Sequence, residues 1–202
     1  MLFRSRQMTS RYERSYKKDQ TELKKNLIVF DLDGCIADSD DYVVTNKEAY
    51  KLEPELFDKK PSKDEENNFS LAYFKAHQKD IKPYSGIFQM FVRLANVENV
   101  AIVTSRFDVV KQQTIEWLKY YCTQYFDETT WRRMQFQISF NEKKEKSLVY
   151  KTRILKELME KHNIILMVED HPEVIDWAKS KGIMVLIPST GYKDLEGTDR
   201  TK

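Results

Sequence analysis

Short apolar runs alternate along the chain with longer segments in which apolar residues recur every three or four positions. The runs are typical of buried strands and predict strands at 27–30, 100–103, 164–168 and 184–187, while the alternation over 136–140 predicts one more. The longer segments predict helices, with stripes over 87–95 and 110–121, a helix over 147–162, and another that Pro172 can start and Gly182 can end.

Strands that alternate with helices predict an α/β fold, a Rossmann-like open parallel sheet with helices on both faces. The charged segment at about 40–82 interrupts this order and contains Pro54 and Pro61. We interpret it as an insertion, a small helical cap or loop segment, with helices near 42–52 and 69–78. The domain organisation is then a basic extension at 1–25 and one domain at 26–202 that carries the insertion.

The distribution of charge is uneven at the N-terminus. The 202 residues hold 34 Lys and Arg against 32 Asp and Glu, but residues 1–25 alone hold eight basic residues against three acidic ones. This extension has three interpretations: a solvated basic terminus, an electrostatic contact with nucleic acid, or an organellar targeting peptide.

The chain offers no sequence signal for a membrane or a secretory route. Its longest apolar run, near 163–168, is far shorter than the roughly 20 residues of a membrane span, and no apolar segment follows Met1–Phe3. The only cysteines, Cys35 and Cys122, suggest neither a disulfide framework nor a zinc site. We therefore expect a reducing, cytoplasmic setting, the host cytoplasm if the protein is viral, with no membrane partner.

Polar and charged residues follow three of the predicted strands directly. They are Asp31 and Asp33, then Thr104, Ser105 and Arg106, then Glu169 and Asp170. Ligands of open α/β sheets bind beyond the carboxyl ends of the strands, so these acids, hydroxyls and one cation predict a phosphate site.

The spacing of Asp31 and Asp33 has a chemical reason. Residues i and i+2 of an extended chain point to the same side, and two adjacent carboxylates repel unless one takes a proton or a cation intervenes. Such a pair can divide the work of nucleophile and general acid. Gly34 allows a sharp turn with backbone N–H groups facing an anion, and Asp170 completes a set of hard oxygens suited to Mg²⁺.

These residues resemble the four motifs of the haloacid dehalogenase superfamily of phosphohydrolases, in the right order. Asp31-Leu-Asp-Gly34 looks like the first motif and Thr104 like the second, while Lys151 looks like the third and Glu169-Asp170 like the fourth. Lys151 is preferred to the lysines of the nearby charge run because it opens an apolar-periodic helix.

The resemblance implies a mechanism and a metal. Asp31 would attack phosphorus and form an aspartyl-phosphate, and Asp33 would protonate the leaving oxygen and later activate water. Mg²⁺ would bind Asp31, the Asp33 backbone carbonyl and Asp170, with Glu169 a ligand or a supporting partner. The remaining predicted residues would hold the phosphate or the substrate: Thr104, Ser105, Arg106 and Lys151. An acid at position 33 also favours phosphoester over dehalogenase chemistry.

A narrower likeness concerns the substrate. Ile81–Gly86, Thr104–Arg106 with Glu116–Leu118, and Glu169–Asp170 with Val174–Trp177 look like the phosphatase domain of bacteriophage-type polynucleotide kinase–phosphatases. The chain departs from that pattern in having Tyr42 in place of an arginine and Ser147 in place of an acid, and it has no P-loop.

Several functions therefore stay open at this point. The resemblance predicts a nucleotide or a nucleic-acid terminal phosphate as substrate, for a 5′-nucleotidase or a polynucleotide 3′-phosphatase. The alternatives are a phosphatase of a small non-nucleotide metabolite, such as a sugar phosphate, and a nucleic-acid-binding or regulatory protein with a vestigial site.

Overall fold

The computed structural model describes residues 24–43, 46–56 and 68–188. The prediction for the basic extension at 1–25 therefore falls almost wholly outside the described residues. Within those ranges, no helix combines the length and the apolar character that crossing a membrane requires.

The centre of the fold is a five-stranded sheet with the order β5-β4-β1-β6-β7. Every pairing in it is parallel, and β1 lies in the middle between β4 and β6. The strand bounds are β1 Lys25–Phe30, β4 Val100–Phe107, β5 Ile138–Asn141, β6 His162–Val168 and β7 Met184–Leu186. The predicted α/β class with an open parallel sheet is confirmed.

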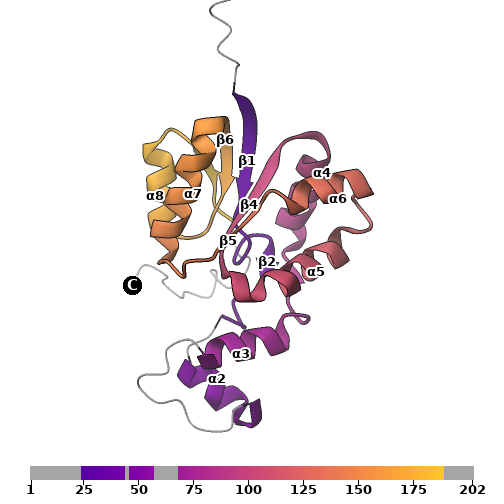
Figure 1. Cartoon of the computed structure of the whole chain (residues 1–202), viewed down its shortest axis with the longest axis vertical. Helices are drawn as coiled ribbons and strands as arrows, with labels where there is room; N and C mark the ends of the chain where they lie inside the picture. The colour runs from indigo at the N-terminus through magenta and orange to yellow at the C-terminus, as the bar shows by residue number, and fades with distance from the viewer. Residues whose placement is uncertain (1–23, 44–45, 57–67, 189–202) are drawn as a thin grey trace, which may run out of the picture.

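Helices cover both faces of the sheet (Figure 1). The alternation of side chains along β1 assigns Ile28 and Phe30 to one face and Leu27 and Val29 to the other. The first face packs against α4, α5 and α6, and the second against α7 and α8. The helix bounds are α4 Ser85–Val97, α5 Lys111–Cys122, α6 Glu128–Gln135, α7 Ser147–Lys161 and α8 Pro172–Ser180.

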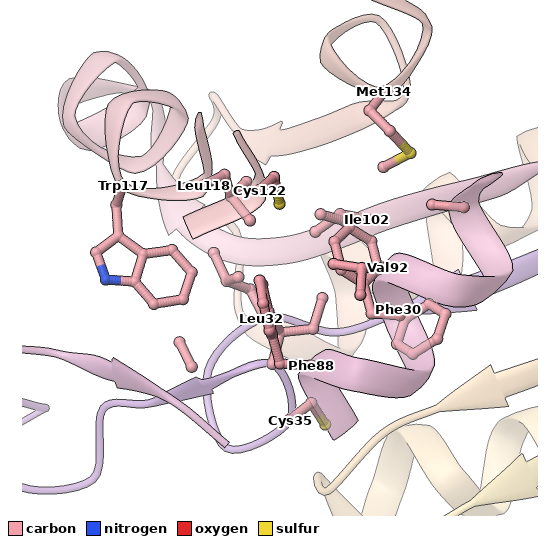
Figure 2. Packing of buried hydrophobic residues seen from close by; sticks show 14 of the residues in the cluster. Phe30, Leu32, Cys35, Phe88, Val92, Ile102, Trp117, Leu118, Cys122 and Met134 are labelled. Atoms are coloured by element: carbon pink, nitrogen blue, oxygen red, sulfur yellow. The ribbon is translucent and has the colours of Figure 1, made fainter. Parts of the chain in front are cut away.

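The core on the first face is built largely from aromatic and branched side chains (Figure 2). Phe30 and Phe91 meet edge to face with ring centroids 5.3 Å apart, and Phe91 also contacts Phe126. Both cysteines are free and buried in this core. Cys35 lies where the core approaches the end of β1, which places a thiol beside the predicted site.

The segment predicted as an insertion leaves the sheet domain and returns to it through a short antiparallel ribbon. Its two strands, β2 Ala37–Asp38 and β3 Lys82–Pro83, pair with each other. Between them lie α2 Asn46–Leu52, the 3₁₀ turn η1 Pro54–Leu56 and α3 Asn68–His77. Figure 1 shows α2 and α3 beyond the end of the sheet at which β1 ends.

Three local predictions differ from the structure. The strand predicted at 136–140 begins only at Ile138, because residues up to Gln135 form α6, which the weakly apolar sequence did not reveal. The strand predicted at 100–103 continues to Phe107, so Thr104–Arg106 lie within β4. The helix predicted from residue 42 begins at Asn46.

Candidate active site

Asp31 lies directly after the central strand of the sheet. Its backbone N–H donates to the Val168 carbonyl at 2.9 Å, which ties the end of β1 to the end of β6. Its side chain is on the α7 side and is only 4% exposed. One carboxylate oxygen, Oδ2, lies 2.7 Å from Lys151 Nζ. The buried carboxylate of Asp31 is thus held in place by a lysine of the helix layer that it faces.

Lys151 is shared by two carboxylates. Its Nζ also donates to both oxygens of Glu169 at 2.9 Å, and the side chains of Lys151 and Glu169 are 2% and 0% exposed. Burial opposes the charge on Lys151, but Asp31 and Glu169 outweigh it and raise the pKa of the lysine. Glu169 further accepts the His171 backbone N–H at 3.0 Å. Glu169 therefore anchors Lys151 toward Asp31.

Asp33 has a separate cationic partner. Arg106, from β4, donates through Nε and Nη2 to the Asp33 carboxylate at 2.9 and 2.6 Å. Burial alone would raise the pKa of Asp33, but the Arg106 guanidinium overrides it and lowers that pKa. The two aspartates of the motif thus belong to different ion pairs.

Arg106 is itself fixed from behind by the insertion and by α5. Its Nη1 donates to Thr114 Oγ1 at 3.1 Å, and its guanidinium lies 4.8 Å from the ring centroid of Phe74. Gln78 Nε2 donates to the same Thr114 hydroxyl at 3.2 Å. These contacts join α3 and α5 to the side chain that holds Asp33.

The two hydroxyls of the second motif face opposite sides of the sheet. Thr104 is fully buried, and its Oγ1 accepts the Arg106 backbone N–H at 3.2 Å. Ser105 points toward α7, where its Oγ lies 2.6 Å from Ser147 Oγ. The strand alternation thus places Thr104 and Arg106 on one side and Ser105 on the other.

Gly34 and Asp170 are in close contact. Gly34 has a φ of +73°, and a Cβ atom built on it would lie 2.1 Å from Asp170 Oδ2. The backbone conformation favours glycine at this position, and any larger residue would have to displace the Asp170 carboxylate. The absence of a side chain lets the Asp170 carboxylate rest on the turn that follows Asp31.

Asp31, Asp170 and Cys35 bring potential ligand atoms within 4.8 Å of one another. The two carboxylates provide the hard oxygens that Mg²⁺ prefers. Burial, followed by the nearby carboxylates, raises the pKa of the Cys35 thiol far above its ordinary value, so the thiol keeps its proton. The residues present therefore fit a magnesium site made by the two aspartates, with Cys35 as a neutral neighbour.

The charges of the described residues around this site do not balance. Four carboxylates face two cations, a formal excess of two negative charges, which matches one divalent ion. Burial and then Asp31 raise the pKa of Asp170, and the same two causes raise the pKa of Glu169. The cluster therefore favours either a bound cation or a bound proton.

The structure brings the predicted residues to one end of the sheet, where they form two neighbouring groups. Asp31, Lys151, Glu169 and Asp170 form one group, and Asp33, Thr104 and Arg106 form another beside it. Ser105 takes part in neither ion pair. Sequence reasoning missed Phe74, Gln78 and Thr114, since their link to Arg106 depends on how α3 meets α5, which no local pattern reveals.

The similarity of this chain to known proteins is seen in solved structures. The sequence matches no protein-family model and no curated protein. Among solved structures, 38 chains match. A haloacid dehalogenase hydrolase of family IA from Entamoeba histolytica has a TM-score of 0.56 at 19% identity, over 85% of this chain and 87% of that one.

Two further neighbours have the same core. A haloacid dehalogenase-like hydrolase from Streptococcus pneumoniae has a TM-score of 0.51 at 15% identity, over 82% of this chain and 84% of that one. A chain of the Pnkp1/Rnl/Hen1 RNA repair complex has a TM-score of 0.50 at 13% identity, over 82% of this chain and 42% of that one. The chain thus has the haloacid dehalogenase fold that its motifs predicted.

Proposed function

We propose that this protein is a Mg²⁺-dependent phosphomonoester hydrolase whose nucleophile is Asp31. The observation that carries the proposal is the placement of one buried carboxylate between a buried lysine 2.7 Å away and a second carboxylate suited to a metal. A nucleophile in this setting is held at the carboxyl end of the sheet, where ligands of such folds bind.

The proposed reaction has two displacements at phosphorus. In the first, a carboxylate oxygen of Asp31 forms a bond to phosphorus while the bond to the ester oxygen breaks, which gives an aspartyl-phosphate. In the second, water attacks this phosphorus and releases inorganic phosphate and free Asp31. Lys151 orients Asp31 in both displacements and neutralises charge near the transferred group.

Asp33 is proposed to give its proton to the leaving oxygen and later to accept one from water. Its pair with Arg106 lowers its pKa and so opposes the protonated form. The pair must therefore loosen when substrate arrives. A phosphate oxygen would compete for the guanidinium, since guanidinium binds carboxylate and phosphate in the same bidentate way. Arg106 and Thr104 are proposed to contact that phosphate.

The side chains of Asp31 and Asp170 would hold Mg²⁺, with the Asp33 backbone carbonyl as a further ligand. When bound, the ion supplies charge neutralisation for the transferred phosphoryl group. Glu169 is proposed as a supporting partner, since both of its oxygens already accept hydrogen bonds from Lys151.

The proposed substrate is a nucleotide or a nucleic-acid terminal phosphate. Support comes from the likeness of Ile81–Gly86 and the neighbouring motifs to polynucleotide phosphatases, and from the RNA repair complex among the structures with the same fold. We also propose a reducing, cytoplasmic location, which the two free and buried thiols support. A contact of the basic extension with nucleic acid stays a prediction, which deletion of residues 1–23 would test.

The decisive test of the chemistry is Asp31→Asn. Loss of the nucleophile should lower kcat for a small ester such as p-nitrophenyl phosphate by a factor on the order of 10⁴ or more. Asp176→Asn is the matched control, because Asp176 is an exposed carboxylate on α8. Full activity of Asp31→Asn, with the circular dichroism of the native fold, would refute the mechanism.

The same assay can compare substrates. Mononucleotides, oligonucleotides with a terminal phosphate and sugar phosphates should differ in kcat/KM, with the nucleic-acid substrates highest. A preference for sugar phosphates would instead support the metabolite alternative, and inactivity toward all of them would support a binding protein with a vestigial site.

A further inference from the structure

A groove of about 410 Å³ runs between the insertion and α5, outside the carboxylate site. One wall comes from α3 and the segment that follows it, the other from successive turns of α5. Figure 1 shows both helices at the end of the sheet where β1 ends. The groove therefore lies toward the same end of the molecule as Asp31.

The wall from the insertion is basic. Lys75, Lys79 and Lys82 line the groove, and all three are exposed. Among the described residues, none of these lysines has an ion-pair partner within 4 Å. One carboxylate, Glu116, faces them and is held by Gln112 Nε2 at 2.8 Å. The groove thus has an excess of positive charge suited to a chain of anions.

The wall from α5 is aromatic. Tyr120 is 77% exposed, and its ring meets Tyr121 edge to face with centroids 5.0 Å apart. Tyr121 in turn contacts Trp117, whose Nε1 donates to the Ile81 carbonyl at 2.9 Å. The Tyr120 ring is therefore exposed to solvent and packs against Tyr121, which Trp117 holds in place.

A buried amide connects the groove to the catalytic side chains. Gln78 lines the groove and is 3% exposed. Thr114 Oγ1 donates to the Val110 carbonyl and accepts from Arg106, so the Gln78 group that faces it must be the amide NH₂. The other end, Oε1, has no partner among the described residues. That atom is itself buried, so Gln78 forms part of the groove wall, and its contact with Thr114 links this wall to Arg106.

We propose that this groove binds the single-stranded nucleic acid that carries the terminal phosphate. The lysines would follow successive phosphates, and Tyr120 would stack on an unpaired base. This inference rests on the proposed function only in assigning the strand's terminal phosphate to the Asp31 site. A duplex hides its base faces, and the carboxylates of an acidic peptide offer no ring for Tyr120 to stack on, so the exposed ring and the lysines together favour a single strand.

The test is fluorescence anisotropy of the whole chain with a labelled single-stranded octanucleotide that lacks a phosphomonoester. Such a probe cannot be hydrolysed, so binding is measured apart from catalysis. Tyr120→Ala should weaken binding about 5- to 150-fold, the range typical of one stacked base. The triple change Lys75→Gln, Lys79→Gln and Lys82→Gln should reduce the slope of log affinity against log salt by about 2.

Matched controls lie on other surfaces. Phe136→Ala removes an aromatic ring that is 90% exposed. Lys156→Gln, Lys161→Gln and Lys179→Gln remove three exposed lysines from α7 and α8. Both controls should keep the wild-type affinity and salt dependence. Binding that Tyr120→Ala leaves unchanged would overturn the proposal, as would equal binding of a duplex or equally effective competition by polyglutamate.

A second measurement separates this inference from the proposed function. For wild type and Tyr120→Ala, kcat/KM for a phosphorylated octanucleotide is divided by kcat/KM for p-nitrophenyl phosphate, and this ratio should fall by about the factor seen in binding. Binding as expected without phosphate release would support the groove and refute the phosphatase. Phosphate release that is unaffected by the changes at Tyr120 and the lysines would support the phosphatase and refute the groove.

Discussion

Lys151 is the residue on which the charge balance of the nucleophile depends. It is the cation that both Asp31 and Glu169 contact, and all three side chains are nearly or completely buried. A buried carboxylate without a partner is costly, so the lysine contributes to stability as well as to catalysis.

Lys151→Met should therefore lower the free energy of unfolding by about 3–5 kcal/mol, the range for breaking a buried ion pair. Urea denaturation would measure the change. Lys156→Met, an exposed position on the same helix, should change stability by less than about 0.5 kcal/mol. Equal effects of the two changes would show that Lys151 is not an essential partner of the carboxylates.

Gly34 offers a second experiment at the residue scale because the chain contains a matched glycine. Gly34 and Gly182 have φ values of +73° and +76°, but a Cβ on Gly182 would meet nothing within 4 Å. Gly34→Ala should therefore cost more than Gly182→Ala and should also weaken Mg²⁺ binding about tenfold or more by displacing Asp170. Calorimetric titration of both variants with Mg²⁺ checks this, and equal affinities would contradict the role of the Gly34–Asp170 contact.

At the scale of elements, the insertion and α5 meet at the Thr114 hydroxyl. It accepts hydrogen bonds from Arg106 and Gln78 and donates to Val110. Through Arg106 this contact reaches Asp33. The position of α3 is thereby coupled to the proposed general acid.

Thr114→Val removes both acceptor roles while it keeps the shape of the side chain. We expect a loss of about 1–3 kcal/mol in stability, since Arg106 and Gln78 each lose a partner. Thr123→Val is the control, because the exposed Thr123 makes the same bond to the carbonyl four residues earlier and, in the described part of the chain, no further side-chain hydrogen bond. In a double-mutant cycle with Gln78→Met, the two losses should be less than additive, and strict additivity would exclude a shared contact.

The elements also show which parts of the fold were predictable. Continuous apolar runs revealed β1, β4, β6 and β7. The signal has a clear cause in β1 and β4, which are largely buried on both faces, whereas β7 is only partly buried although its sequence is equally apolar. Phe136 was interpreted as a strand residue although it is 90% exposed at the end of α6, because a single aromatic residue looks the same in either setting. Asp31 and Asp170 were predictable from strand ends, whereas the Arg106–Asp33 pair joins residues 73 positions apart.

At the scale of the whole molecule, the excess negative charge of the site couples metal binding, proton binding and stability. Asp170 has a raised pKa in the fold and an ordinary one near 4 in the unfolded chain. A carboxyl of this kind stabilises the fold fully below about pH 4, and this contribution is lost as the pH rises through its raised folded value. Without metal, the site should therefore weaken the fold progressively above about pH 4.

Mg²⁺ and Asp170→Asn should each reduce the repulsion among the carboxylates of the site, but in different ways. In EDTA near neutral pH, Asp170→Asn should be more stable than wild type, and the difference should vanish at acid pH. Mg²⁺ in about 100-fold excess over its Kd should stabilise wild type by about 2.7 kcal/mol and the variant far less, so the order of stabilities reverses. Urea unfolding from about pH 4 to pH 8, with Asp176→Asn as the exposed control, measures both effects. If Asp170→Asn were less stable than wild type in EDTA at every pH, the carboxylates would not be in conflict, and the charge argument for a divalent ion would fail.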